Sequence, residues 1–210
     1  MGVPLLAEEF VDEAEEQEPA EPPEGLVDIE WLRMVRQGES SGAARLFEKY
    51  SGPLLRFTGR MLGNRSEAEE VTQEVFVKMI SKVDQYDGRA SVASWLFAIA
   101  SNACRDRLRR SSRRPMVSLD AVAESPSPGV PADARLAERE RSVAVRRALS
   151  KLSDEQREAL VLARYHDMPY AEIARTLKIS EGAVKTRIFR AMETLKETFE
   201  GDARWNAAMS

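Results

Sequence analysis

The sequence predicts an all-α protein in which two small helical domains are joined by a flexible linker. Apolar residues recur every three or four positions over two long segments, and no stretch of useful length shows the alternation typical of strands. Between these segments, residues 112–137 contain four prolines and several serines, a composition typical of linkers. We therefore place one domain at residues 27–111 and the other at 138–200, and treat 201–210 as a C-terminal tail.

Charge is distributed unevenly along the chain. The 210 residues carry a net charge of −4, but residues 1–30 hold eleven acidic side chains and no lysine or arginine, which leaves the rest of the chain at +7. Acids and prolines together predict that residues 1–26 form a disordered tail. A basic body with an acidic appendage is typical of proteins that bind polyanions. The tail itself is either a solubilising leader or a DNA mimic that shields the basic faces of the free protein.

Several classes of protein and site are not expected. With Cys104 as the one cysteine and His166 as the one histidine, we expect no disulfide, no zinc site of the usual kind and no cofactor. The apolar stretches are too short to span a bilayer and the acidic start is unlike a signal peptide, so we expect a cytoplasmic protein. His166 stands beside Asp167 at a helix end without a serine or cysteine nucleophile, which disfavours an enzyme. Cys104 is expected to fill a small buried space.

The helical pattern of the first domain begins at Asp28. A second helix is expected after Gly38 to Gly42, and Pro53 is expected in the first turn of a third helix that ends at Gly63 and Asn64. The apolar positions of these three helices are Trp31, Leu32, Val35, Leu46, Phe47, Tyr50, Leu54, Leu55, Phe57, Met61 and Leu62.

Two further helices complete the first domain. Ser66 and Glu69 have the spacing of a capping box, which predicts a helix from Ser66 to about Val83. After a loop with a turn at Asp87-Gly88, Ser91 is expected to cap the next helix. The apolar stripes are Val71, Val75, Phe76, Met79 and Ile80 on the first of these helices, and Val92, Leu96, Ile99 and Ala103 on the second.

The second domain is expected to begin with a helix from about Leu136 to Leu149. Ser153 and Gln156 have the spacing of another capping box, and Asp167 to Pro169 should stop the helix that it opens.

Residues 170–189 have the pattern of a helix-turn-helix. A short helix, Tyr170–Leu177, is followed by a tight turn and by a second helix that Ser180 caps. The apolar positions that would join the two helices are Ile173, Ala174, Leu177, Ile179, Val184 and Ile188. Lys185, Arg187 and Arg190 would project from the other side, where they can reach phosphates or guanine edges. The alternative is an ordinary helical hairpin with a solvated basic face.

A second basic cluster closes the first domain. Residues 105–114 contain six arginines and one acid, which gives a strong electrostatic attraction to a phosphate backbone. Trp95 and Phe97 lie upstream on the same helix, and aromatic rings near arginines can stack on unpaired bases. Two alternatives stay open: Trp95 is a core residue, and the arginines are a solvated helix end that complements the helix dipole.

These motifs together resemble the bacterial RNA polymerase sigma factors of the extracytoplasmic-function (ECF) group, in the sigma-70 superfamily. The resemblance lies in Ser66–Lys78, in Trp95–Asn102 followed by Asp106 and Arg109-Arg110, and in Leu149–Glu158 leading into the helix-turn-helix. It covers about residues 28–110 and 138–197. In that family the first domain is region 2 and the second is region 4, with a linker between them.

The resemblance implies a function for each domain. Region 2 would bind the clamp helices of the polymerase β′ subunit and, through the loop Asp84–Ser94 and the helix after it, capture a flipped base of the −10 element and help DNA melting. Region 4 would read the −35 element as duplex, while its other face meets the β flap. The implied site residues are Glu70, Gln73, Glu74 and Phe76 for core polymerase; Trp95, Asn102, Arg105, Arg109 and Arg110 for the −10 element; and Ser180, Lys185, Thr186, Arg187 and Arg190 for the −35 element.

The resemblance also implies a further kind of protein partner, and the sequence departs from the family pattern at a few positions. Many family members have an anti-sigma factor that docks across both domains. Arg107 stands where the family often has an aromatic residue, and Ser101 stands where it often has a basic one. The acidic tail is also longer than the usual start. The alternative function is a dimeric helix-turn-helix regulator that does not bind core polymerase as a sigma subunit.

Overall fold

The computed structural model describes residues 24–111 and 143–199, which form helices and connecting turns with no strand among them. This confirms the all-α prediction. The predicted linker 112–137, the C-terminal tail 201–210 and all but the last three residues of the predicted N-terminal tail 1–26 lie outside the described residues, as do Arg113, Arg114 and the start of the helix expected from Leu136. The named elements are α1 (Glu24–Arg36), α2 (Ser40–Leu62), α3 (Arg65–Ser81), η1 (Val83–Gln85), α4 (Val92–Ser111), α6 (Asp154–Tyr165), α7 (Tyr170–Leu177) and α8 (Glu181–Phe199); residues 143–149 are also helical.

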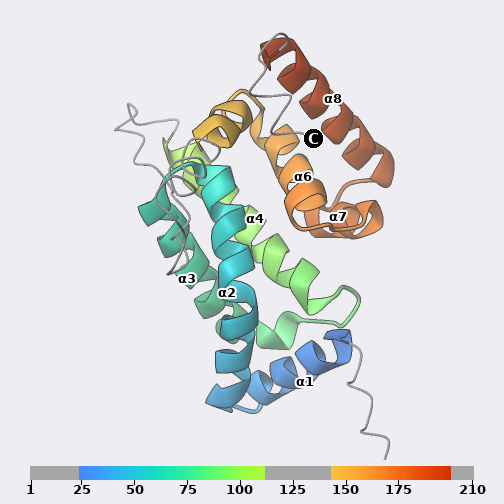
Figure 1. Ribbon diagram of the computed structural model, residues 1–210. Helices are drawn as coiled ribbons and strands as arrows, with labels where there is room; N and C mark the ends of the chain where they lie inside the picture. Colours follow the sequence, from blue (N-terminus) through green and yellow to red (C-terminus); the bar gives the residue numbers. More distant parts are fainter. Residues whose placement is uncertain (1–23, 112–142, 200–210) are drawn as a thin grey trace, which may run out of the picture.

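In the first domain, the long helix α2 packs against α3 and α4, and α1 lies across one end of it (Figure 1). The crossing of α1 and α2 is close, because a Cβ atom at Gly42 would lie 2.4 Å from the carbonyl oxygen of Trp31. Only glycine fits there. Helix α1 begins at Glu24, four residues before the position that the sequence pattern predicts, so residues 24–26 are not part of a disordered tail.

Helix α2 replaces the two helices expected around Pro53. It runs without interruption from Ser40 to Leu62 and contains Pro53 in its interior. The residues on both sides of the proline, Leu46, Leu54 and Phe57, are fully buried in the same core. A proline inside a helix costs about 3 kcal/mol, whereas each large buried apolar side chain contributes about 1.5–3 kcal/mol. Burial along the whole length of α2 therefore outweighs the lost backbone hydrogen bond.

The N-terminus of α3 is capped by Asn64 and not by Ser66, so the predicted capping box is wrong. The Asn64 side chain accepts a hydrogen bond from the Glu67 backbone N–H at 3.0 Å, and Glu69 pairs with Arg65 at 2.8 Å instead of reaching back to a cap. The reason is local: Gly63 ends α2 in the left-handed conformation, at φ 69°, and Asn64 then takes the extended backbone of a cap.

The remaining boundaries in the first domain differ little from prediction. Helix α3 ends at Ser81, and Ile80 is 52% exposed, so it does not belong to the buried stripe. The turn at Asp87-Gly88 is present, with Gly88 at φ 73°. Ser91 caps α4 as predicted, its hydroxyl oxygen accepting from the Ser94 N–H at 3.1 Å.

The second domain follows the sequence prediction closely. The Ser153–Gln156 capping box is present in both directions. Helix α7 has the predicted bounds, Lys178 turns the chain in the left-handed conformation, and the Ser180 side chain accepts from the Ala183 N–H at 3.1 Å. The helix-turn-helix is therefore confirmed as a fold.

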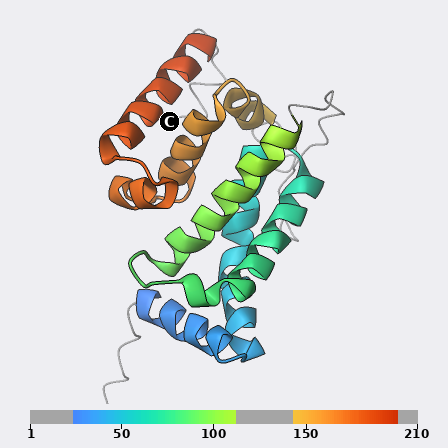
Figure 2. The same ribbon diagram turned by 180° about the vertical axis from the view of Figure 1, so that it is seen from behind.

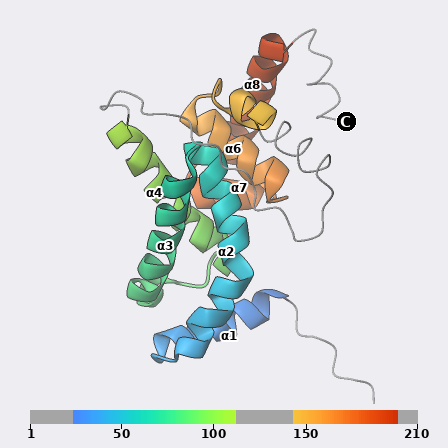
Figure 3. The ribbon, with the colours of Figure 1, turned by 60° about the vertical axis from the view of Figure 1, so that its left-hand side comes forward.

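The two domains pack directly on one another, which the sequence pattern did not predict. Helix α6 lies against α2, and α7 lies against α4. The neighbouring positions of α7 and α4 can be followed in Figure 2. Figure 3 shows the second domain seated over one end of the first, with α8 outermost. The buried apolar residues of both domains form one continuous core.

The capping correction gives a direct test of the fold. Asn64→Ala should lower the free energy of unfolding by about 0.5–2 kcal/mol, because one N–H in the first turn of α3 loses its partner. Ser66→Ala, at an exposed helical position, should change it by less than about 0.5 kcal/mol. Urea unfolding of both variants measures the difference, and equal losses would contradict the assignment of Asn64 as the cap.

Candidate nucleic-acid interface

An arginine expected to contact DNA instead joins the two domains. Arg105 on α4 donates from Nε to Glu158 Oε1 at 3.1 Å and from Nη2 to Oε2 at 3.1 Å. Glu158 lies on α6 and its side chain is 1% exposed, while that of Arg105 is 35% exposed. A two-point pair of this kind is strong and directional. In this arrangement, Arg105 is not available to the −10 element.

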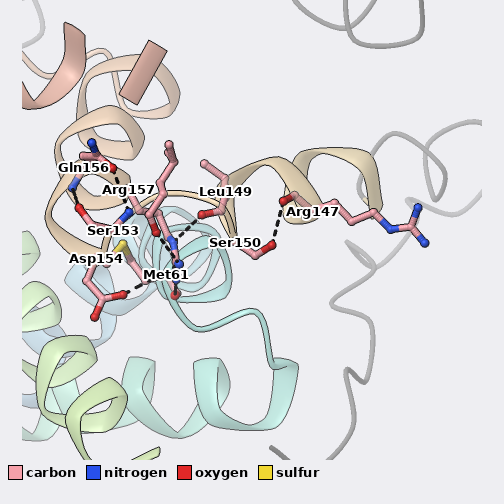
Figure 4. A network of polar contacts seen from close by, with 9 residues as sticks. Met61, Arg147, Leu149, Ser150, Ser153, Asp154, Gln156 and Arg157 are labelled. Atoms are coloured by element: carbon pink, nitrogen blue, oxygen red, sulfur yellow. Dashed lines mark hydrogen bonds and ion pairs between the residues drawn. The ribbon is translucent and has the colours of Figure 1, made fainter. Parts of the chain in front are cut away.

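A second arginine, on the same helix as Glu158, also bridges the domains. Arg157 on α6 donates to the carbonyl oxygen of Met61, in the last turn of α2, at 2.7 Å. It also donates to the carbonyls of Leu149 and Leu152 at 2.9 and 3.2 Å. In Figure 4 the Arg157 side chain points between the start of α6 and the end of α2, whereas Arg147 points away from both. Arg157 thus satisfies a terminal carbonyl that α2 itself leaves without a helical partner.

His166 is the third contact between the domains. It ends α6, and its ring lies 4.6 Å from that of Phe97 and 6.0 Å from that of Phe57, measured between centroids. Its Nε2 is buried with no hydrogen-bond partner among the described residues. Burial, followed by the nearby charges of Arg60 and Arg56, lowers the pKa of His166 to about 4. The imidazole is therefore a neutral packing group at neutral pH.

Along α4, the polar residues other than Arg105 that are predicted to contact the −10 element are exposed, whereas the aromatic residues are partly or fully buried. Asn102, Arg109 and Arg110 are exposed. Trp95 is half-buried, with its ring 5.3 Å from that of Tyr86, and Phe97 is in the core at 4% exposed, so Phe97 offers no ring for stacking. Asn102, Arg109, Arg110 and part of Trp95 thus remain accessible.

The face of α3 predicted to bind core polymerase is mixed in character. Gln73 and Glu74 are exposed, and Glu70 is exposed while paired with Arg107 at 2.9 Å. Phe76 is only 7% exposed and packs against Phe47 at 4.8 Å between ring centroids, so little of its ring is accessible to a partner in this arrangement, and its contact with core polymerase stays a prediction. Three apolar side chains in this region are exposed: Phe47 and Ile80, which the sequence pattern placed among the apolar positions, and Val77, which it did not single out, at 51, 52 and 66%.

The outer face of α8 carries most of the predicted −35 residues. Lys185, Thr186 and Arg190 are exposed, and Phe189 between them is 63% exposed, which the sequence analysis did not single out. Arg187 differs: it pairs with Glu155 of α6 at 3.0 Å and its side chain is 23% exposed, so it lies on the side of α8 that faces α6. The side chain of Ser180 acts as the cap of α8.

The described residues contain no candidate metal site, no candidate membrane-spanning helix and no exposed cysteine. No group of three or more histidine, cysteine, aspartate or glutamate side chains could hold a metal ion there. None of its helices has the length and apolarity needed to cross a membrane. Cys104 is buried as expected, and burial raises the pKa of its thiol.

Comparison with known proteins adds sequence and structural relatives. Residues 46–114 match the family model for sigma-70 region 2, and residues 142–195 match that for sigma-70 region 4. The chain is 30% identical over 176 residues to the ECF RNA polymerase sigma factor SigW of Bacillus subtilis (strain 168), covering 79% of this chain and 93% of SigW. It is 32% identical over 168 residues to the ECF RNA polymerase sigma factor SigM of Mycobacterium tuberculosis (strain H37Rv), covering 80% and 82%.

Among solved structures, the fold is similar to that of CnrH in complex with the cytosolic domain of CnrY. The TM-score is 0.63 at 25% identity, over 84% of this chain and 99% of CnrH.

The environment of His166 predicts a pH dependence of stability. The pKa of His166 is lower in the folded protein than the ordinary 6.5, so the unfolded chain takes up the proton first as pH falls. The stability that this neutral imidazole contributes is therefore fully present above pH 6.5 and is lost between about 6.5 and 4. Between pH 7 and 4.5, the free energy of unfolding of the wild-type chain should fall by about 1–2 kcal/mol more than that of His166→Phe. This range includes a reduction because His166 is only partly buried. Urea unfolding at both values measures this, and parallel losses would contradict it.

Proposed function

The chain belongs to the ECF group of bacterial RNA polymerase sigma factors, in the sigma-70 family, and we propose how its residues divide that function. Sigma factors bind core polymerase and direct it to promoters, and the polymerase performs the chemistry. Family membership favours this function over the dimeric regulator. We assign residues 27–111 to core binding and the −10 element, and residues 138–200 to the −35 element. Because both partners are cytoplasmic, we place the protein in the cytoplasm.

Core binding is assigned to the outer face of α3. Exposed Val77 and Ile80, with Phe47 of α2 beside them, provide apolar area that a partner can cover. Glu70, Gln73 and Glu74 provide acidic and amide groups that suit the basic clamp helices of β′. An apolar centre with a polar rim is the usual composition of a protein interface. The exposed apolar side chains are the observation that best supports this face over the rest of the domain.

Capture of the −10 element is assigned to α4 and to the loop before it. Asn102, Arg109 and Arg110 give this helix an exposed polar and basic surface, and the half-buried ring of Trp95 adjoins the loop. A base turned out of the duplex has an unstacking cost of a few kcal/mol, so a preformed receptor with a positive wall is needed. Arg105 would join this surface once it leaves Glu158.

Reading of the −35 element is assigned to the exposed face of α8. Lys185, Thr186 and Arg190 can reach base edges and phosphates in a major groove. Phe189, at 63% exposed on the same face, is suited to contact with the methyl group of thymine. Arg187 has a different role in this proposal, because its pairing with Glu155 orients α8 on α6.

The described arrangement is then a closed state of the free protein. The −10 and −35 elements are roughly 25 base pairs apart, on the order of 80 Å at about 3.4 Å per base pair. In the closed state α7 packs on α4 and α8 packs on α7, so the two reading surfaces are far too close together to engage both elements. The domains must separate, and the contacts of Arg105, Arg157 and His166 must break, when the polymerase binds.

An anti-sigma factor is also proposed as a partner. The similar structure of CnrH contains the cytosolic domain of CnrY, so a protein partner can bind a chain of this fold. For this chain, the contact between its two domains is the surface that such a partner would stabilise or replace.

The assignment of the core-binding face predicts a loss of binding without a loss of fold. Gln73→Ala combined with Glu74→Ala should abolish core binding, because both side chains lie on the exposed rim of the proposed interface. Gln37→Ala combined with Glu39→Ala removes the same two residue types from an exposed turn elsewhere in the domain and serves as the matched control. Titration of labelled protein with core polymerase measures both, and unchanged affinity of the first variant would show that the face is misplaced.

The assignment of the −35 face gives Arg187 and Arg190 different roles, although they are only three residues apart. With polymerase bound, Arg190→Ala should weaken binding to a promoter with the preferred −35 sequence by about 1–3 kcal/mol, because Arg190 is expected to contact a base. Binding to a promoter with a scrambled −35 sequence should weaken less. Arg187→Ala should lack this sequence preference, because its partner is Glu155. Competition binding on both duplexes provides the measurement. A stronger sequence preference of the Arg187 variant would place that arginine on the DNA and contradict the assignment.

A further inference from the structure

The loop between α3 and α4 has a defined internal shape. Its η1 turn is followed by Tyr86, whose hydroxyl donates to the carbonyl of Ala90 at 2.6 Å. The Asp87 carboxylate accepts from the Arg89 N–H at 3.0 Å, and Gly88 takes the left-handed conformation. These contacts all join residues within the loop. They set its shape but do not determine where it lies relative to the helices.

Arg36, the last residue of α1, ties this loop to the rest of the domain. Its Nη2 donates to the carbonyl oxygens of Val83 at 3.0 Å and Tyr86 at 3.2 Å, across 47 and 50 residues of sequence. Its Nε lies 3.4 Å from the Asp84 carboxylate. One guanidinium therefore contacts three points of the turn that opens the loop. A planar group with five donors is suited to this, whereas an ammonium group is not.

The helix that carries Arg36 is firmly anchored. Leu32 and Val35 of α1 are buried, at 2 and 8% exposed. The close crossing at Gly42 leaves no room for α1 to shift toward α2. The position of Arg36 is thus set by the core of the domain. Arg36 then holds the carbonyls of Val83 and Tyr86, while the buried Val83 side chain anchors the start of the loop.

The consequence appears at the aromatic pair beside the proposed −10 surface. Arg36 holds the backbone carbonyl of Tyr86, and the ring of Tyr86 lies against that of Trp95 on α4, at 5.3 Å and an interplanar angle of 54°. If the loop drifted, the pair would separate and the receptor for a flipped base would have to be ordered by the DNA itself. A receptor ordered beforehand binds more effectively.

We propose that Arg36 is a positioning residue for −10 capture: its guanidinium holds the turn 83–86 so that Tyr86 and Trp95 form a ready wall for the unpaired strand. This inference rests on the proposed function of α4 and the loop. Arg36 itself need not touch the DNA. It acts through the backbone of Val83 and Tyr86.

The test compares Arg36→Gln and Arg36→Lys with Arg33→Gln in the full-length chain. Arg33 lies one turn earlier on α1 and pairs with Glu30, so its variant is a matched control for loss of charge. Hydrogen exchange of the amides in residues 83–91, without DNA, should accelerate in both Arg36 variants and not in the control. With core polymerase, both Arg36 variants should form open complexes on duplex promoter about tenfold more slowly, at unchanged core affinity.

The outcomes separate this inference from the function on which it rests. Normal behaviour of Arg36→Lys would indicate that charge alone matters and would overturn the inference, as would unchanged exchange in the loop or an equal defect of Arg33→Gln. Asn102→Ala tests the −10 surface independently and should slow opening on duplex, with partial rescue on a pre-melted bubble. If Asn102→Ala is defective while the Arg36 variants open promoters normally, the inference alone fails. If neither residue matters, the −10 assignment fails.

Discussion

The carboxylate of Glu158 is almost completely buried, and its charge is met by Arg105 from the other domain. A buried charge is tolerated only when it is paired and hydrogen-bonded, and removal of one partner leaves a large desolvation penalty. The position of the second domain on the first therefore depends on this pair. Arg157 on the Met61 carbonyl and the ring of His166 against those of Phe57 and Phe97 add to it. These three contacts join the two described parts of the chain, residues 24–111 and 143–199, into one body.

The same pair connects the fold to promoter recognition. Arg105 belongs to the basic stretch that the −10 proposal uses, so in the closed state part of the DNA-binding surface is occupied by the protein itself. The exposed face of α3 and the outer face of α8 remain open, since neither lies between the domains. In our account, core polymerase engages these faces first, and separation of the domains then frees Arg105 for the −10 strand.

The features that were predicted correctly from the sequence are those fixed by interactions between residues close together in the chain. Helix α7, the Ser153 capping box and the Ser180 cap follow from signals within a few residues of one another, and all were correct. Ser66 and Glu69 have the spacing of a capping box, but Asn64 is the residue that caps α3. Gly63 turns the chain directly before it and leaves Asn64 in the extended conformation of a cap. Pro53 was expected to start a helix because the burial that keeps α2 continuous comes from distant residues. The exposure of Phe47 and burial of Phe76 depend on packing between helices, as does the pairing of Arg187 with Glu155. The contact between the domains left no sequence signal at all, since Arg157 and Glu158 look like ordinary surface residues of a capped helix.

The distance between the two domains, before and after the polymerase binds, tests this account most directly. Dyes at Gln37→Cys and Glu193→Cys would report it by single-molecule energy transfer, with the native Cys104 buried and poorly reactive. We predict a single distance in the free chain, set by the closed state, and a change of this distance in the complex with core polymerase and promoter DNA. An unchanged distance in a complex that transcribes would contradict the claim that the Arg105–Glu158 pair must break for this protein to work.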